Sequence, residues 1–254
     1  MRFRHVSYRG FEFYVPEPEA EAGSADDVGM QHWFDASLRS TLTYAEQVWH
    51  VNRFIEDSNL SILEVFCGFG MSTVTIPEGR IEKHVGLDHD MDCCQAFQFL
   101  RPDADVLMTD SYIAAPVAAR VRQFDCIYLE FNSMTVYRAM REEVERGLLD
   151  SLLTSGARYI IFVDSAKVKE HLHYKTYSEF FDENIKDSRS YVNAVDQYFR
   201  HKYGYHMRAC AYDNINYTYL LDAEYWPIEC DMIDTRKVVN LSQFKHLGYI
   251  DAGI

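Results

Sequence analysis

The 254-residue chain lacks several features that mark special classes of protein. No apolar run approaches the ~20 residues that a membrane span needs, and no apolar segment follows the basic residues 1–10 as it would in a signal peptide. The six cysteines show no C-x-x-C spacing, which argues against a zinc ribbon and a disulfide framework. We therefore expect a soluble cytoplasmic protein with reduced cysteines, with no membrane contact and no bound metal.

Positive charge is also scarce. The chain has 25 Lys and Arg against 39 Asp and Glu, a formal net charge of -14, so the molecule as a whole does not attract a polyanion. Any contact with a nucleic acid must come from a local basic surface. Aromatic residues are plentiful at 15%, and we expect most of them in the core, with an excess that suits stacking surfaces.

The first 60 residues are predicted to form an N-terminal extension. Residues 1–15 are basic and partly alternating, which indicates a short strand or arm, and residues 16–30 form an acidic connector rich in small residues. Over residues 31–57 the apolar positions recur at helical spacing, which predicts one or two helices.

Residues 61–254 are predicted to form one α/β domain. Short β-branched runs alternate with helix-length segments, a pattern typical of a parallel sheet with crossover helices. The five predicted parallel strands are Ser61–Phe66, Lys83–Asp88, Ala104–Met108, Asp125–Glu130 and Ala157–Val163. An amphipathic helix is expected over Tyr137–Leu153, and a hairpin over His206–Tyr212 and Tyr217–Ala223. The expected fold is a three-layer sandwich around a seven-stranded, mostly parallel Rossmann-like sheet that ends in this antiparallel hairpin.

The segment that carries most chemical information is E-V-F-C-G-F-G at residues 64–70. A strand with an acidic residue near its end, followed by Gly68 and Gly70, allows a tight turn that brings the backbone close to a bound nucleoside. Thr73 stands where the dinucleotide fingerprint has its third glycine, and the Gly-Lys-Ser/Thr of a phosphate-binding loop is missing. A nucleoside site is therefore favoured over a phosphate cradle.

This segment resembles the first motif of class I S-adenosylmethionine-dependent methyltransferases. Three further strands carry acids at their ends, in V-G-L-D at 85–88, D-V-L-M-T-D at 105–110 and F-D-C-I-Y-L-E at 124–130, which is similar to the order of motifs in that family. The resemblance covers residues 61–223 and implies S-adenosylmethionine as the cofactor. It implies a ribose contact for Asp88, an adenine contact for Asp110, and a place near the methionine ammonium for Glu64. The residues expected around the cofactor are Glu64, Phe66, Cys67, Gly68, Phe69, Gly70, Asp88, His89, Asp110 and Ser111. Taken singly, each acid could instead cap a helix that follows its strand.

The fourth strand end is where the resemblance places substrate chemistry. Methyltransferases that act on the amino groups of bases often carry Asp/Asn-Pro-Pro-aromatic at this point, whereas this chain has Glu130-Phe131-Asn132-Ser133. Glu130 is expected to orient the acceptor or to take its proton, and Asn132 to hydrogen-bond the acceptor. A Pro-Cys nucleophile is missing, and Cys126 inside the strand is interpreted as a buried thiol.

Two clusters of cations, histidines and aromatics, at residues 164–175 and 200–208, are candidates for phosphate and base contacts. They supply the predicted substrate-binding residues Lys167, Lys169, His171 and Tyr203. If the acceptor is a nucleic acid, we expect the two clusters to form one positive surface beside Glu130. A solvated helix face is the alternative for each cluster. His171 and His173 would lie on opposite sides of a helix, so they do not predict a shared metal.

The sequence thus predicts an enzyme that transfers a methyl group from S-adenosylmethionine to a nitrogen or oxygen, with a nucleic acid as the favoured acceptor. Other functions stay open: a catalytically silent cofactor-binding subunit, a different nucleoside-using enzyme on the same sheet, or a protein-binding module marked by the acidic N-terminal region. The oligomeric state is not predicted.

Overall fold

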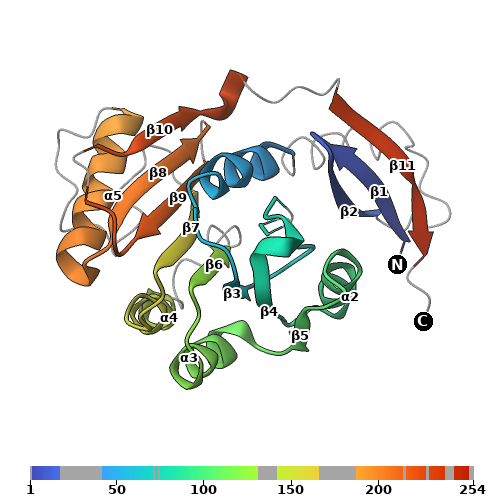
Figure 1. Ribbon diagram of the computed structural model, residues 1–254, viewed down its shortest axis with the longest axis horizontal. Coiled ribbons are helices and arrows are strands. Elements are labelled where there is room, and N and C mark those ends of the chain that lie inside the picture. The colour runs from blue at the N-terminus through green and yellow to red at the C-terminus, as the bar shows by residue number, and fades with distance from the viewer. Residues whose placement is uncertain are drawn as a thin grey trace.

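A central mixed sheet organises the chain (Figure 1). The computed structural model describes residues 2–17, 42–70, 72–73, 75–130, 142–165, 187–213, 216–226, 229–237 and 243–251. Over these residues the sheet has eight strands in the order β10-β8-β9-β7-β6-β3-β4-β5. All neighbouring strands are parallel except in the β7–β9 and β8–β9 pairs. The expected α/β architecture with a mostly parallel sheet is confirmed.

The strands of the central sheet lie close to the predicted ranges. They are β3 (Leu60–Val65), β4 (Ile81–Asp88), β5 (Asp105–Met108), β6 (Cys126–Glu130), β7 (Tyr159–Ser165), β8 (His206–Tyr212), β9 (Asn216–Asp222) and β10 (Asp231–Asp234). The predicted count of seven strands was one too low, because β10 was missed. It has four residues with an acid at each end, so it shows too little alternation to predict a strand.

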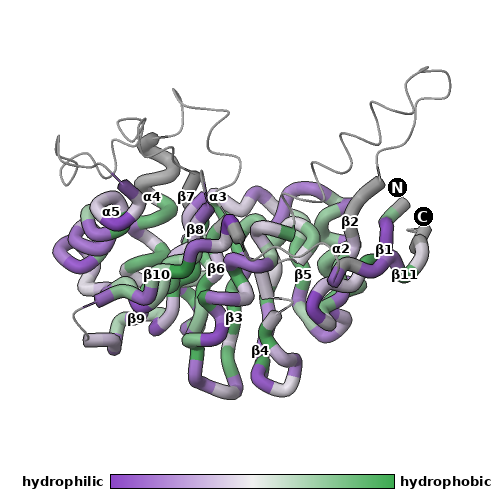
Figure 2. Tube along the Cα trace, turned by 90° about the horizontal axis from the view of Figure 1, so that it is seen from above, coloured by the Kyte–Doolittle hydropathy of each residue, from purple (hydrophilic) through white to green (hydrophobic). Residues whose placement is uncertain are grey.

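Helices cover both faces of this sheet. On one face α3 (Ser111–Val121), α4 (Glu142–Leu153) and α5 (Ser188–Tyr203) bury aliphatic and aromatic side chains against β3, β4, β6 and β7. On the other face lie the helix at residues 42–52 and α2 (Met91–Leu100). The trace in Figure 2 is hydrophobic along the central strands and mainly hydrophilic around the periphery, as burial on both faces requires.

The connection from β3 to β4 departs from the expected pattern of crossover helices. Its described residues form turns and the short 3-10 helix η1 (Glu78–Arg80). The segment at residues 72–77 contains four β-branched residues and ends in Pro77, a composition with low helix propensity. The loop after β3 therefore has no described α-helix behind it.

A second sheet of three strands, in the order β11-β1-β2, lies beside the helix at residues 42–52 (Figure 1). Its strands are β1 (Arg2–Tyr8), β2 (Phe11–Glu17) and β11 (Phe244–Asp251). The predicted N-terminal strand or arm is in fact a hairpin, because Arg9 and Gly10 both have positive φ, at 53° and 85°, as a type I′ turn requires. β11 pairs antiparallel with β1, so the two ends of the described chain meet in this sheet. Phe3 of β1 meets Phe69 edge to face at 6.4 Å, which places the sheet against the glycine loop.

Candidate functional site

The sheet has a topological switch point at β3. From β3 the chain steps outward to β4 and β5 and then returns to β6 on the other side of β3. In open α/β sheets such a reversal leaves a crevice at the carboxyl ends of the strands, and ligands bind there. This is the edge where the glycine loop and the predicted strand-end acids lie.

The glycine loop begins immediately after β3 and turns sharply. Phe66, Gly68 and Gly70 all have positive φ, at 57°, 49° and 74°. The Cys67 amide donates to the Leu87 carbonyl at 2.9 Å, and the Gly70 amide donates to the Cys67 carbonyl at the same distance. A Cβ on Gly70 would lie 3.1 Å from the Phe97 ring of α2, so this position needs glycine for both backbone and packing. The loop is held in one shape by the end of β4 and by α2.

Asp88 ends β4 and receives the glycine loop. The Gly68 amide donates to its Oδ2 at 3.0 Å, and the Asp90 amide donates to its Oδ1 at 2.9 Å. A carboxylate has about four acceptor positions, so two remain after these bonds. The side chain keeps 8% of its surface exposed, beside His89, which is 82% exposed. Asp88 can therefore accept further hydrogen bonds from a molecule placed at this edge.

Hydrogen bonds connect the residues that follow β5 to the end of β4. The Thr109 amide donates to the Asp88 carbonyl at 2.7 Å, and the Ser111 hydroxyl donates to the Leu87 carbonyl at 3.1 Å. Asp110 caps α3, since its side chain accepts from the Tyr112 amide at 2.9 Å. The capping alternative therefore holds for Asp110, yet its exposed carboxylate lies at the same edge as Asp88 and retains acceptor capacity.

Glu64 lies fully buried behind the loop rather than open to solvent. Its Oε2 accepts from the Thr73 hydroxyl at 2.8 Å and lies 3.0 Å from Nε2 of His84. The contact between Glu64 and His84 joins β3 to β4 beneath the loop. Thr73, the other partner of Glu64, stands where the dinucleotide fingerprint has its third glycine. Glu64 thus fixes the loop from behind through Oε2, while its buried Oε1 has no hydrogen-bond partner among the described residues.

A second buried network supports the loop, and sequence reasoning missed it. The side-chain Nδ2 of Asn52 donates to the Ser72 carbonyl at 3.0 Å and to the Thr75 hydroxyl at 2.8 Å. Asn52 in turn accepts from the Tyr128 hydroxyl of β6 at 2.8 Å. The Tyr44 hydroxyl lies 2.7 Å from the Ser72 hydroxyl. Polar residues spaced along an otherwise apolar helix face were the available signal.

An aromatic pair also borders the candidate crevice. The Phe66 ring meets the Tyr112 ring edge to face at 4.9 Å between centroids. Phe66 was predicted, whereas Tyr112, two residues after Asp110, was not. An aromatic residue two positions after a strand-end acid is the signal that could have found it.

The cysteines at this site are thiols of low reactivity. Cys67 and Cys126 are fully buried, and burial raises the pKa of each thiol well above its usual value. Neither is therefore an activated nucleophile. The interpretation of Cys126 as a buried thiol is confirmed.

The predicted catalytic and substrate residues are described only in part. Glu130 is the last residue of β6 and pairs with Val163 of β7, which places its backbone at the carboxyl edge, one strand from β3. Asn132, Lys167, Lys169 and His171 lie outside the described residues.

Tyr203 does not join Glu130. It ends α5 at the opposite, amino edge, where the hydroxyl of its neighbour Tyr205 donates to the Ala157 carbonyl just before β7. The Tyr203 hydroxyl donates to Asp150, and burial together with this hydrogen bond raises its pKa. A helix that follows a parallel strand runs back along the sheet, so its last turn lies a strand length away from the carboxyl edge.

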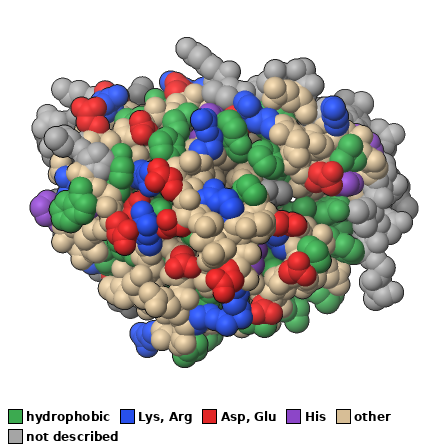
Figure 3. All heavy atoms as spheres, in the orientation of Figure 1, with side chains coloured by type: hydrophobic (Ala, Val, Ile, Leu, Met, Phe, Trp, Pro, Cys, Tyr) green, Lys and Arg blue, Asp and Glu red, His purple; other side chains and the backbone are tan. Residues whose placement is uncertain are grey.

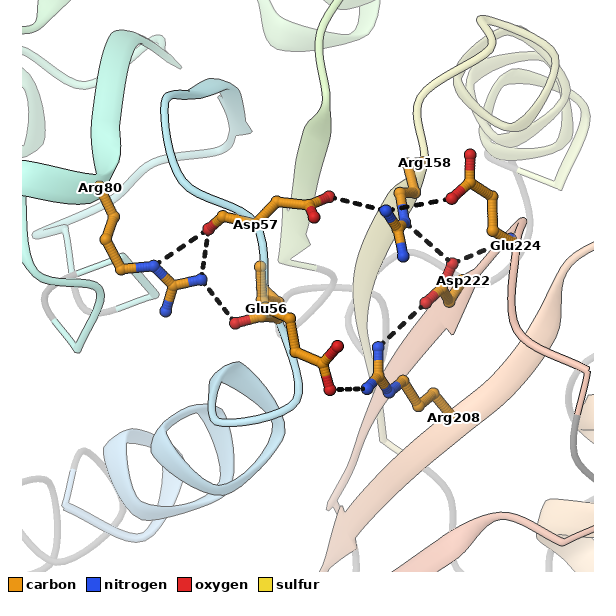
Figure 4. A network of polar contacts seen from close by, with 8 residues as sticks. Glu56, Asp57, Arg80, Arg158, Arg208, Asp222 and Glu224 are labelled. Carbon is orange, nitrogen blue, oxygen red and sulfur yellow. Dashed lines mark hydrogen bonds and ion pairs between the residues drawn. The ribbon is translucent and has the colours of Figure 1, made fainter.

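The cations of the 200–208 cluster are paired with acids. Arg200 contacts Asp196 at 2.7 Å, and Lys202 contacts Asp150 at 3.1 Å. Figure 4 shows Arg208 joined to Glu56 and Asp222, and Arg158 joined to Asp57, Asp222 and Glu224, in one network at the amino edge. On the face seen in Figure 3, acidic and basic side chains are interspersed. The described residues of this cluster therefore form no positive surface.

The described ranges contain neither a metal-binding cluster nor a membrane-spanning helix. No group of three or more His, Cys, Asp or Glu side chains is arranged to hold a metal ion there. Likewise, none of the helices described is both long enough and apolar enough to span a bilayer.

Comparison with solved structures gives similarity to methyltransferases. The methyltransferase domain of bacterial CtHen1 has 12% identity and a TM-score of 0.46, over 71% of this chain and 97% of that one. Magnesium protoporphyrin IX methyltransferase from Synechocystis PCC 6803, solved with bound SAH, has 10% identity and a TM-score of 0.47, over 79% and 89%. Fibrillarin from Aeropyrum pernix, solved with S-adenosyl-L-methionine, has 10% identity and a TM-score of 0.42, over 65% and 67%. No protein-family model matches the sequence, and no curated protein matches it.

Proposed function

We propose that the chain is an S-adenosylmethionine-dependent methyltransferase whose cofactor lies at the carboxyl ends of β3 and β4. The observation that carries this proposal is the 3.0 Å hydrogen bond from the Gly68 amide to Asp88. It folds a glycine loop onto a strand-end carboxylate at the switch point of the sheet, an arrangement suited to a nucleoside. The resemblance of residues 64–70 to the first methyltransferase motif supports the same cofactor.

The described residues provide donors and acceptors of the right kind for each part of the cofactor. Asp88, with two acceptor positions left, would accept the ribose hydroxyls. Asp110 would accept the adenine amine, beside the Phe66–Tyr112 pair, which offers an apolar border for the ring. The backbone of Cys67 to Gly70 would border the methionine part. Glu64 would act through the loop that it holds.

When bound, S-adenosylmethionine supplies an electrophilic methyl group on a sulfonium. Catalysis of such a transfer rests largely on holding the acceptor about 3 Å from that carbon, in line with the bond that breaks. Glu130 ends β6, the strand beside β3, so its position suits a group that orients the acceptor or takes its proton. Asn132 is proposed to hydrogen-bond the acceptor.

We propose a nucleic acid as the methyl acceptor. The support is the mixture of cations, histidines and aromatics at residues 164–175, where Lys167, Lys169 and His171 are the proposed contacts. The paired cations of the other cluster add no support. All six cysteines are free, which suits the reducing cytoplasm proposed as its location.

The test is transfer of a labelled methyl group from the cofactor into separate pools of DNA, RNA and protein from the source cell. Wild type should label one pool, and Glu130→Gln should label it about 10²- to 10⁴-fold more slowly, the usual effect of losing a general base. Equal labelling by both proteins would reject Glu130 as the catalytic residue. Cofactor binding without labelling of any pool would favour the silent cofactor-binding subunit.

A further inference from the structure

α3 has few charged side chains for a helix on the surface of this protein. Its eleven residues include one charged side chain, Arg120, in a chain with 39 acidic and 25 basic residues. Ala115 and Ala119 face the core, while Ile113, Val117 and Val121 are 70%, 56% and 79% exposed. A helix that is apolar on all sides is normally buried on all sides. The exposed face of α3 is therefore expected to have a partner.

The exposed stripe carries an acid at one end and a base at the other. At 100° per residue, Asp110, Ile113, Val117, Arg120 and Val121 all lie within about 60° of the direction of Val117. Asp110 is the N-cap of α3, and Arg120 lies in its last turn. Both are exposed, and no ion pair of Arg120 occurs over the described part of the chain. A stripe of this kind is complementary to its own copy turned end to end.

We propose that α3 is the contact surface of a symmetric homodimer, in which the two copies of α3 pack antiparallel across a two-fold axis. Ile113 lies three residues after Asp110, and Val117 lies three residues before Arg120. The register that sets Ile113 opposite the second copy's Val117 therefore brings Asp110 level with the second copy's Arg120. Each contact occurs twice, as an isologous interface requires.

The local charges at α3 suit a second copy, although the net charge of the two molecules opposes their association. Two molecules that each carry a net charge of -14 repel one another over most of their surface. At α3 the apolar side chains meet, and each Asp110 faces an Arg120, so this face avoids that repulsion. Asp110 has about four acceptor positions, of which one takes the Tyr112 amide and one the proposed adenine amine, so the others are left for the partner arginine.

The small area of the exposed stripe on α3 determines how tightly the proposed dimer is expected to associate. A standard interface buries about 800 Å² per partner, and weak interfaces bury less. One helix face with three exposed side chains falls in the weak class, so we expect a dissociation constant of the order of 10–100 µM. The exposed ion pairs would fix the register more than the affinity.

Sedimentation velocity of the full chain over a concentration series tests the proposal. Wild type should shift from monomer to dimer, and Val117→Glu should weaken the dimer at least about 10-fold, because it buries an unpaired charge on each side. Met91→Glu is the matched control, since Met91 of α2 is also 56% exposed, and it should dimerise like wild type. Arg120→Glu should weaken the dimer several-fold by setting two acids against each other.

Circular dichroism and thermal melting show whether each variant is folded. If Val117→Glu does not fold, Ile113→Glu takes its place beside Arg120→Glu. Wild type that stays monomeric throughout would overturn the proposal. A dimer that persists in the α3 variants would also overturn it. The same holds if Met91→Glu abolishes the dimer and Val117→Glu does not.

Discussion

The Gly68 amide donates a hydrogen bond to Oδ2 of Asp88 at 3.0 Å, across the carboxyl ends of two adjacent parallel strands. The bond joins the two parts of the proposed cofactor site, the turn that brings backbone close to a ligand and the carboxylate that would accept its hydroxyls. Because Asp88 also accepts from the Asp90 amide, its orientation is fixed before any ligand arrives. Such preorganisation lowers the cost of binding.

A comparison of variants at Asp88 and Asp90 distinguishes a role in cofactor binding from a role in folding stability. Asp88→Ala removes the proposed ribose acceptor and should weaken S-adenosylmethionine binding about 30- to 1000-fold, the effect of losing two charge-assisted hydrogen bonds. Asp90→Ala is the matched control, because its side chain also accepts two backbone amides, those of Asp92 and Cys93. Both variants should lose similar stability in thermal melts. If Asp90→Ala weakens binding as much as Asp88→Ala does, the contribution of Asp88 is structural.

Glycine at position 70 should be required for packing as well as for backbone conformation. Gly70→Ala places a Cβ 3.1 Å from Phe97 and 3.2 Å from Leu100 at φ 74°, whereas Gly156 has φ 87° with no atom within 4 Å of its added Cβ. Gly156→Ala should cost about 1–2 kcal/mol of unfolding free energy from backbone strain alone. Gly70→Ala should cost about 1–3 kcal/mol more from overpacking and should also weaken cofactor binding. Equal losses in denaturant unfolding would show that packing against α2 is unimportant.

Acid should weaken the contact between the small sheet and the helix at residues 42–52. Burial alone would raise the pKa of Glu46, but His50, whose Nε2 lies 3.3 Å from Oε1, and the hydrogen bond from Arg9 lower that pKa below its usual value. A lowered folded-state pKa gives stability that is present above the unfolded pKa and lost as the pH falls through the folded pKa. Glu46→Gln should therefore cost about 1–3 kcal/mol at pH 7 and progressively less below the unfolded pKa of about 4.3. Urea unfolding against pH measures this, with the exposed Glu12→Gln as control; a loss that does not change with pH would contradict it.

Much of the central sheet could be predicted because its signals are local. β-branched runs bounded by strand-end acids mark β3, β4, β5 and β6 within one or two residues. The pairing of β11 with β1 joins opposite ends of the chain, and no local pattern encodes such a contact. Between β3 and β4 the alternating pattern predicts a crossover helix, but the β-branched segment before Pro77 disfavours one, and the described residues form turns and η1.

The positions of the site residues could be predicted where the direction of a strand alone determines the sheet edge on which a residue lies. All parallel strands end at one edge, so Asp88, Asp110 and Glu130 follow from the strand assignments. A helix that follows a parallel strand runs back to the amino edge of the sheet. The end of α5, with Tyr203, therefore lies at the edge opposite to Glu130. The bonds of Glu64 to Thr73 and His84 were not predictable, since they depend on side-chain packing between strands and loop.

Calorimetric titration of the wild-type protein with S-adenosylmethionine and S-adenosylhomocysteine tests the central claim most directly. We predict one site per chain for each ligand, with dissociation constants of about 1–100 µM, and competition between the two. Absence of binding for both ligands at roughly 1 mM, which corresponds to less than about 4 kcal/mol of binding free energy, would contradict the proposed cofactor and with it the methyltransferase assignment.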